Sequence, residues 1–214
     1  SAPEITKTRE ENDNDDPSHQ LWKVCHTAED DGREHVQYLV DDLGADVNVR
    51  DPTAAEDGMT CLLQAVMEGK LEVVQFLLER GADPTAVSPQ TRLSATHLAG
   101  IHGRKDILQM MDERFGLNVL SYDQHGQSPM HHACVGRQLR HVQTVQWYLE
   151  EKGVRVDAKT IGTGETCLDL LMNGTADTTP NNRYMKALLM DYYEEAAQED
   201  DDDASRSSRH KDEF

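Results

Sequence analysis

Cysteine and histidine are the residues of this 214-residue chain whose side chains could bind a metal, exchange disulfides or catalyse a reaction. The four cysteines, Cys25, Cys61, Cys134 and Cys167, lie far apart in the sequence, so no Cys-x-x-Cys pair typical of a zinc or redox site is present. Their spacing is also unlike that of a secreted disulfide scaffold, and we expect a reducing compartment.

The ten histidines would suit a metal-dependent hydrolase only if several of them converged. The sequence does not favour this, because no Cys/His spacing typical of zinc occurs, and the adjacent His131 and His132 would point about 100° apart on a helix. The motifs GxSxG, HExxH, GxGxxG and the P-loop are missing as well. We predict that the chain is not an enzyme and binds no metal or cofactor, with a metal-dependent hydrolase as a remote alternative.

The formal net charge of −19 restricts the classes of partner. It repels phosphate backbones and disfavours nucleic-acid binding, whereas a partner protein with a basic surface is electrostatically compatible. No run approaches about 20 apolar residues, so no membrane contact is predicted, and the first residues lack the apolar centre of a secretory signal. We expect a cytoplasmic or nuclear protein, and an organelle is also compatible with the sequence.

Glycines at regular intervals set the positions of the helices that must carry these residues. Those between two apolar helical runs are Gly32, Gly69 and Gly103. Those that end the second run of a unit are Gly44, Gly81, Gly116 and Gly153. The intervals are 34 to 37 residues, which predicts a repeated unit of two short helices. Such a unit cannot bury its apolar face alone, so copies must stack into an elongated array.

The clearest unit is GMTCLLQAVMEGKLEVVQFLLERGAD, residues 58–83. Thr60 is expected to cap its first helix, and Gly81 is expected to end its second helix in the left-handed conformation. This stretch resembles the ankyrin repeat, whose pattern runs D-x-x-G-x-T-P-L-H-x-A-A-x-x-G-x-x-x-V-V-x-x-L-L-x-x-G-A-D. Partial matches are LWKVCHTAEDDGREHVQYLVDDLGADVN at 21–48, LSATHLAGIHGRKDILQMM at 93–111, GQSPMHHACVGR at 126–137 and GETCLDLLMNG at 164–174.

The resemblance implies an all-α ankyrin-repeat solenoid of stacked helix-turn-helix units with β-turn fingers. The expected repeats are 18–50, 51–84, 85–119, 120–157 and 158–193. An acidic arm, residues 1–17, precedes them, and an acidic tail, residues 194–214, follows; both are expected to be disordered unless a partner holds them. One departure from the pattern is Arg92, which occupies the position of the turn glycine.

The same alignment suggests structural roles for the cysteines and most of the histidines. Cys61 and Cys167 take the proline position of TPLH, Cys25 its leucine position and Cys134 the second alanine position, so all four are expected to be small buried groups. His97, His131 and His26 fall at or beside the histidine position, where an imidazole bridges backbone groups of neighbouring repeats. The histidines expected to make surface contacts are His102, His125 and His132.

By resemblance, partners bind the concave face, which is lined by residues beside the turn glycines and before the inter-helix glycines. These residues are Trp22, Glu56, Asp57, Met59, Met67, Glu68, Gln90, Thr91, Leu93, Ile101, His102, Gln124, His125, Gln127, Val135, Thr163 and Glu165. Trp22, Met59, Met67 and Ile101 would form an apolar centre.

The leading hypothesis is a protein-binding adaptor, regulator or subunit of a larger complex, with one or more protein partners and no homo-oligomer. The alternative is an architectural subunit held by its acidic termini and long fingers.

Overall fold

The protein folds into an elongated array of helices. The computed structural model describes residues 16–27, 32–51, 58–174 and 179–209, with side chains described as far as Gln198. The first helices of the units are α2 (Pro17–His26), α4 (Cys61–Glu68), α6 (Ala95–Ile101), α8 (Pro129–Cys134) and α10 (Cys167–Gly174). The second helices are α3 (Arg33–Gln37) with the π-helix η1 (Tyr38–Asp42), α5 (Leu71–Glu79), α7 (Lys105–Phe115), α9 (Leu139–Glu150) and α11 (Pro180–Arg209).

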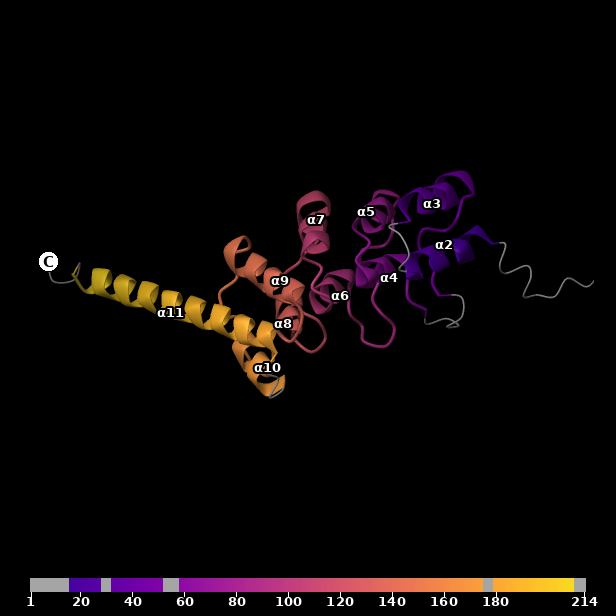
Figure 1. The fold of residues 1–214 in the computed structure, drawn as a ribbon. Helices are drawn as coiled ribbons and strands as arrows, with labels where there is room; N and C mark the ends of the chain where they lie inside the picture. The colour runs from indigo at the N-terminus through magenta and orange to yellow at the C-terminus, as the bar shows by residue number, and fades with distance from the viewer. Residues whose placement is uncertain (1–15, 28–31, 52–57, 175–178, 210–214) are drawn as a thin grey trace, which may run out of the picture.

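The helices form two parallel rows (Figure 1). Each first helix packs against the next first helix along the chain, and each second helix packs against the next second helix. Within the described ranges there is no named strand. The fingers between units are closed by isolated antiparallel bridges, which pair Arg50 with Thr60, Val87 with Ser94 and Lys159 with Thr166. The predicted all-α solenoid is therefore confirmed.

A continuous apolar spine runs between the two rows. Leu63 on α4, Leu77 on α5, Met111 on α7 and Tyr148 on α9 are all fully buried, and each belongs to the same hydrophobic cluster. Because each unit has an apolar face on both sides, burial comes from stacking on its neighbours and not from a separate core in each unit.

Local sequence signals act as predicted at the ends of the helices. The Thr60 hydroxyl accepts a hydrogen bond from the Leu63 amide at 3.3 Å and so caps α4. Gly81 follows α5 with a φ of +85°, the left-handed conformation expected of it. Arg92, which replaces the turn glycine, also has a positive φ, +56°, and is the one non-glycine residue of the described chain that does. The turn is therefore kept although its glycine is missing.

Side chains at the start of the second helices tie successive units together. Each donates to a backbone carbonyl in the last turn of the first helix of the preceding unit. The pairs are Lys70 Nζ with Val24 O at 2.7 Å, Arg104 Nη2 with Met67 O at 2.7 Å, and His141 Nε2 with Ile101 O at 2.8 Å. The last carbonyls of a helix lack an amide partner within it, so these contacts satisfy acceptors that would otherwise depend on water or, at Val24, on the Thr27 hydroxyl at 3.5 Å.

A polar ladder also links the second helices on the outer side of the array. Its rungs are Arg80 with Asp41 at 2.6 Å, Arg114 with Glu79 at 3.3 Å, Lys152 with Asp112 at 2.5 Å and Tyr192 with Glu150 at 2.9 Å. Exposed ion pairs of this kind contribute little stability individually. Together with the Tyr192–Glu150 hydrogen bond, they place a polar contact between each pair of neighbouring second helices.

Two features differ from the sequence-based expectations. The cysteines are buried as predicted, but they are paired: disulfides join Cys25 to Cys61 and Cys134 to Cys167. The acidic tail predicted to be disordered from residue 194 is instead helical, because α11 continues to Arg209. Its alanine, glutamate and glutamine residues favour helix, and buried Met185 and Leu189 anchor the first half of α11 to the array. The predicted arm at 1–17 lies outside the described residues up to position 15.

Candidate partner-binding surface

The fingers of the C-terminal half form a connected row along one edge of the array. The Gln124 side-chain amide donates to Thr91 O of the preceding finger at 3.3 Å. The Ile161 amide of the following finger donates to Gly126 O at 2.8 Å. Three successive fingers are therefore joined by two hydrogen bonds, both accepted by backbone carbonyls, and their tips keep a fixed relative position.

Asp123 organises the middle finger. Its carboxylate accepts hydrogen bonds from the amides of His125 and Gln127, at 2.8 and 2.9 Å, and from His132 Nε2 at 2.9 Å. Its side chain is only 1% exposed. Burial alone would raise the pKa of Asp123, but the hydrogen bonds from Gln127, His132 and His125 outweigh this and hold the pKa below its usual value. The finger is thus closed around an ionised carboxylate.

Two of the predicted structural histidines act as expected. His97 Nε2 donates to Ser121 O at 3.1 Å, and its Nδ1 accepts from the Ser94 hydroxyl at 2.7 Å. His131 makes the equivalent pair of contacts, with Ala158 O at 3.1 Å and the Ser128 hydroxyl at 2.7 Å. Burial lowers the pKa of both imidazoles and favours the neutral form.

The other histidines have more varied surroundings. His26 is exposed and stacks on Trp22 with ring centroids 5.1 Å apart, and no backbone bridge like those of His97 and His131 is seen. His132 was expected to make surface contacts, but it is bound to Asp123 and its side chain is only 13% exposed. His125 is exposed at the fingertip, as expected.

The structure gives no converging histidine site. Within the described part of the chain, no three His, Cys, Asp or Glu side chains lie close enough to hold a metal ion. The buried histidines His97, His131 and His141 use both ring nitrogens in hydrogen bonds with the protein itself. Their lone pairs are therefore already engaged.

The predicted contact residues fall into four groups. Those exposed to solvent are Gln90, Thr91, Gln124, His125, Val135 and Thr163. Those half-buried are Trp22, Met59, Met67, Glu68, Ile101, His102, Gln127 and Glu165. Glu56 and Asp57 lie outside the described residues. Leu93 does not reach the surface: it is 6% exposed and belongs to the hydrophobic core.

The expected apolar centre is mostly occupied by the core. Met59, Met67 and Ile101 are half-buried and pack against the hydrophobic cluster, so only part of each side chain is open to a partner. Trp22 is also half-buried, and its indole Nε1 is buried without a hydrogen-bond partner. Apart from Val135 at the end of α8, the exposed part of the predicted surface is therefore the polar row of fingertips.

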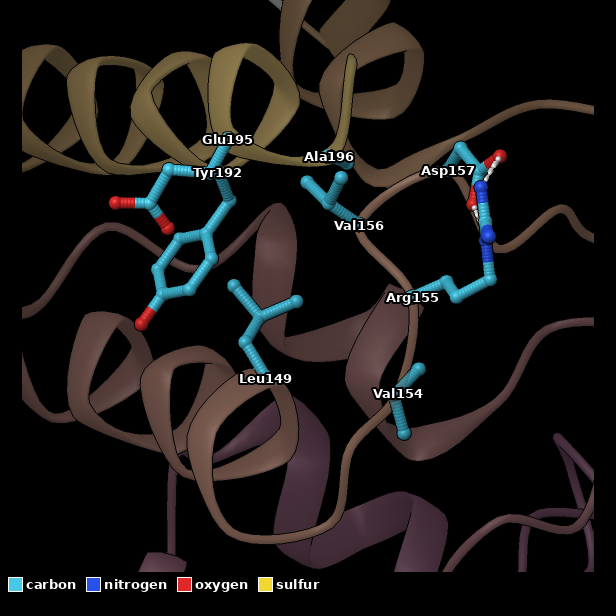
Figure 2. Close-up of a pocket in the computed structure, with 8 residues that line it drawn as sticks. All are labelled: Leu149, Val154, Arg155, Val156, Asp157, Tyr192, Glu195 and Ala196. Carbon is cyan, nitrogen blue, oxygen red and sulfur yellow. Dashed lines mark hydrogen bonds and ion pairs between the residues drawn. The ribbon is translucent and has the colours of Figure 1, made fainter. Parts of the chain in front are cut away.

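Two hollows were not predicted from the sequence. One, of about 280 Å³, lies between α11 and the loop after α9, where Tyr192 and Leu149 face Val154 and Val156 (Figure 2). Burial, and after it the hydrogen bond to Glu150, raises the pKa of Tyr192 to about 12.

The second hollow, of about 220 Å³, lies among the inter-helix loops and contains three basic residues, Arg104, Lys105 and Arg140. A signal for it exists in the sequence, since the basic residues Arg104 and Lys105 directly follow the inter-helix glycine Gly103. Taken singly, each of these residues resembles an ordinary solvated charge.

The chain is similar to known proteins in its repeated units. The family described as ankyrin repeats (three copies) matches residues 11–88 and 62–160, which together cover more than two thirds of the chain. A similar protein is the E3 ubiquitin-protein ligase Ufd4 of Drosophila melanogaster, which is 32% identical over 124 residues. That match covers 58% of this chain and 4% of the ligase. Among the described helices, none has both the length and the apolar character needed to cross a lipid bilayer.

Proposed function

Because the chain belongs to the ankyrin repeat family, we propose that it is a non-enzymatic protein-binding module that serves as an adaptor, a regulator or a subunit of a larger complex. The observation that carries this proposal is the row of exposed fingertip residues, represented by Gln90, His125 and Thr163. These side chains are open to solvent, whereas the fingers that present them are fixed to one another by hydrogen bonds.

A fixed row of side chains favours binding for a thermodynamic reason. Association costs free energy when loops and side chains must become ordered, and fingers that are already connected have less to lose. The polar fingertips can form hydrogen bonds, and the chain's net charge of −19 complements a partner with a basic surface. We propose one or more protein partners of this kind.

The similarity to the ubiquitin ligase does not extend the proposal to ligase activity. The matching segment covers only 4% of that protein, and the activity in its name belongs to the whole protein. What the match shows is a similar segment of 124 residues, and the repeat architecture of this chain rests on the family match.

The proposal is tested by adding positive charge to the fingertips. A Gln90→Lys and His125→Lys double variant should repel a basic partner without disturbing the core, because both side chains are exposed. Tagged wild type is expressed in its native cell, and its partners are identified and quantified by mass spectrometry after purification. We expect the fingertip variant to retain less than about a tenth of the main partner, a loss typical of interface hot spots.

The matched control places the same charges on the outer row. A Gln75→Lys and Gln109→Lys double variant changes two residues whose side chains bond only to glutamates of their own helices, Glu79 and Glu113. It should bind like wild type. Equal losses in both variants, or full binding by the fingertip variant, would contradict binding through the fingers.

One observation favours the alternative of an architectural subunit. α11 contains 30 residues, about 45 Å of helix, and in Figure 1 it extends well past the rest of the array. A helix of this length could anchor the chain in an assembly. Truncated chains lacking 1–17 and 194–214 separate the two roles: partner retention by the truncated chain supports the fingers, and its loss supports the termini.

A further inference from the structure

The basic hollow lies where three consecutive inter-helix segments meet. Its wall is formed by Gly69 and Leu71 from the α4–α5 connection, by residues 103–107 around the start of α7, and by Arg140 and Gln143 of α9. Leu71 and Ile107 supply apolar surface. The rest of the lining is dominated by three cationic side chains and contains one carboxylate, that of Asp106.

The three cations outnumber the carboxylates beside them, which are Asp106 in the lining and Glu68, whose charge acts on Arg104. Arg104 uses Nε and Nη2 on Met67 O, a neutral carbonyl, at 3.3 and 2.7 Å. Arg140 Nε is buried and has no hydrogen-bond partner. None of the ion pairs formed among the described residues includes Arg104, Lys105 or Arg140. The hollow therefore collects positive charge in a protein whose net charge is −19.

The two arginines are close enough to oppose one another. Burial, and after it the charge of Arg140, lower the pKa of Arg104, and Glu68 offsets this only in part. Burial, followed by the charges of Arg104 and Arg140, also lowers the pKa of the adjacent His102. Keeping like charges together in a partly buried hollow is unfavourable unless an anion compensates them.

The backbone around the hollow adds to its affinity for an anion. α7 begins at Lys105, and its N-cap residue Arg104 makes no side-chain capping bond, so the first-turn amides of this 11-residue helix lack that acceptor. Gly69 has a φ of +82°, and a Cβ at this position would collide with the Arg104 guanidinium. The glycine thus allows the guanidinium to lie against the loop.

We propose that this hollow binds one anionic side chain of a partner protein, either the carboxylate of an acidic residue or the phosphate of a phosphorylated one, through Arg104, Lys105 and Arg140. The two arginines supply directional donors, Lys105 supplies a flexible charge, and Leu71 and Ile107 contact the methylene groups of the ligand side chain.

A protein is the carrier that fits the remaining observations. A volume of about 220 Å³ holds a single side chain, and the chain's net charge of −19 disfavours a continuous polyanion such as DNA or RNA. The inference rests on the proposed function only in assuming that the anionic group belongs to a partner protein. The site itself differs from the fingertip row and is tested without any native partner.

The test uses the purified full chain and three fluorescein-labelled peptides of otherwise identical Gly/Ala sequence. Their central residue is glutamate, phosphoserine or glutamine, and binding is followed by fluorescence anisotropy at low salt. We expect saturable binding of the glutamate or phosphoserine peptide, at least tenfold tighter than that of the glutamine peptide. The stronger of the two identifies the source of the anion. The Arg140→Gln and Lys105→Gln double variant should lose at least tenfold in affinity.

The control double variant is Arg183→Gln with Lys186→Gln, which removes the same charges from exposed positions of α11. It should bind like wild type. Thermal unfolding separates binding from folding: without peptide, the pocket variant should unfold at the same or a higher temperature, because it loses a buried unpaired group and a repulsive charge.

Indistinguishable binding of the three peptides, or equal losses in the pocket and control variants, would overturn the site. Tighter binding of a single-stranded DNA oligonucleotide than of either anionic peptide would overturn the assignment to a protein partner. Because no native partner is present in the assay, failure here leaves the fingertip experiment unaffected, and the reverse also holds.

Discussion

Reduction of the two disulfides should loosen the ends of the array before its centre. Cys25–Cys61 joins α2 to α4, and Cys134–Cys167 joins α8 to α10, so each bond ties a terminal first helix to its neighbour. No cysteine lies on α6. A terminal unit packs on one side only and is therefore the part of a linear array that opens first.

The size of the effect follows from the length of chain that each disulfide closes. The sequence separations are 36 and 33 residues. Restricting the unfolded chain over such loops contributes roughly 3.8 and 3.7 kcal/mol to stability in the chain-entropy model. Measured values fall below this when the unfolded chain retains structure, so we expect a loss of about 2–4 kcal/mol per disulfide.

Urea denaturation of the wild type with and without a phosphine reductant measures this loss, since reduction leaves every sulfur atom in place. Hydrogen exchange should then rise first in α2 and α3 for a Cys25→Ala and Cys61→Ala variant. A variant with Cys134→Ala and Cys167→Ala should instead show faster exchange in α10 and α11. Intact mass before and after reduction is the control for bond formation. Four free thiols in the native protein, or a uniform rise in exchange along the array, would refute the reasoning.

Three further changes test other contacts. Tyr148→Phe removes the donor to Val119 O, a 3.0 Å bond in the core, and should lower the free energy of unfolding by about 1–2 kcal/mol in urea denaturation. Because burial lowers the pKa of His131 below its usual value of about 6.5, the unfolded state binds more protons near that pH. Stability should therefore fall as the pH drops from 7 to 5, and less steeply in His131→Gln than in the exposed control His125→Gln. Arg92→Gly should raise the free energy of unfolding by about 0.5–1 kcal/mol, and with it the thermal midpoint, because glycine adopts the positive φ of this position without a steric cost. An unchanged or lower midpoint would show that the turn is not strained.

The repeated architecture could be predicted because its signals are local. A cap such as Thr60, a left-handed glycine such as Gly81 and an imidazole such as His131 each act within a few residues or on the adjacent unit. Since every unit repeats these signals at nearly the same interval, the elongated stack follows from the sequence. The family assignment rested on the same residues.

The disulfides could not be predicted because they depend on the stagger between helices. Cys134 ends α8 and Cys167 begins α10, so their contact requires the end of one first helix to lie beside the start of the next. At the equivalent contact between α6 and α8, the end of one first helix again lies beside the start of the next: Gly100 packs against Pro129, and an added Cβ on Gly100 would collide with the Pro129 carbonyl. The spacing of the cysteines in the sequence does not reveal this stagger between neighbouring first helices.

Charge was the other source of error. The acidic residues beyond position 193 suggested disorder, yet the helix begun by packed residues such as Met185 propagates through them. The net charge of −19 led to the prediction of a basic partner, which stays a prediction, but it gave no sign of the basic hollow, because Arg104 and Arg140 come together only after stacking. An average over the chain cannot reveal a local excess of the opposite sign.

The two candidate surfaces depend on stacking in different ways. The fingertip row runs into the last finger through the bond between Ile161 and Gly126, so it depends on the unit that the disulfide of Cys134 secures. The basic hollow is built from the α4–α5 connection, α7 and α9, none of which is the final unit at either end. Loosening the C-terminal end would therefore weaken a partner that binds the fingertips and spare an anion held in the hollow. A partner that uses both surfaces would remain attached at the centre while its contacts with the last finger open and close.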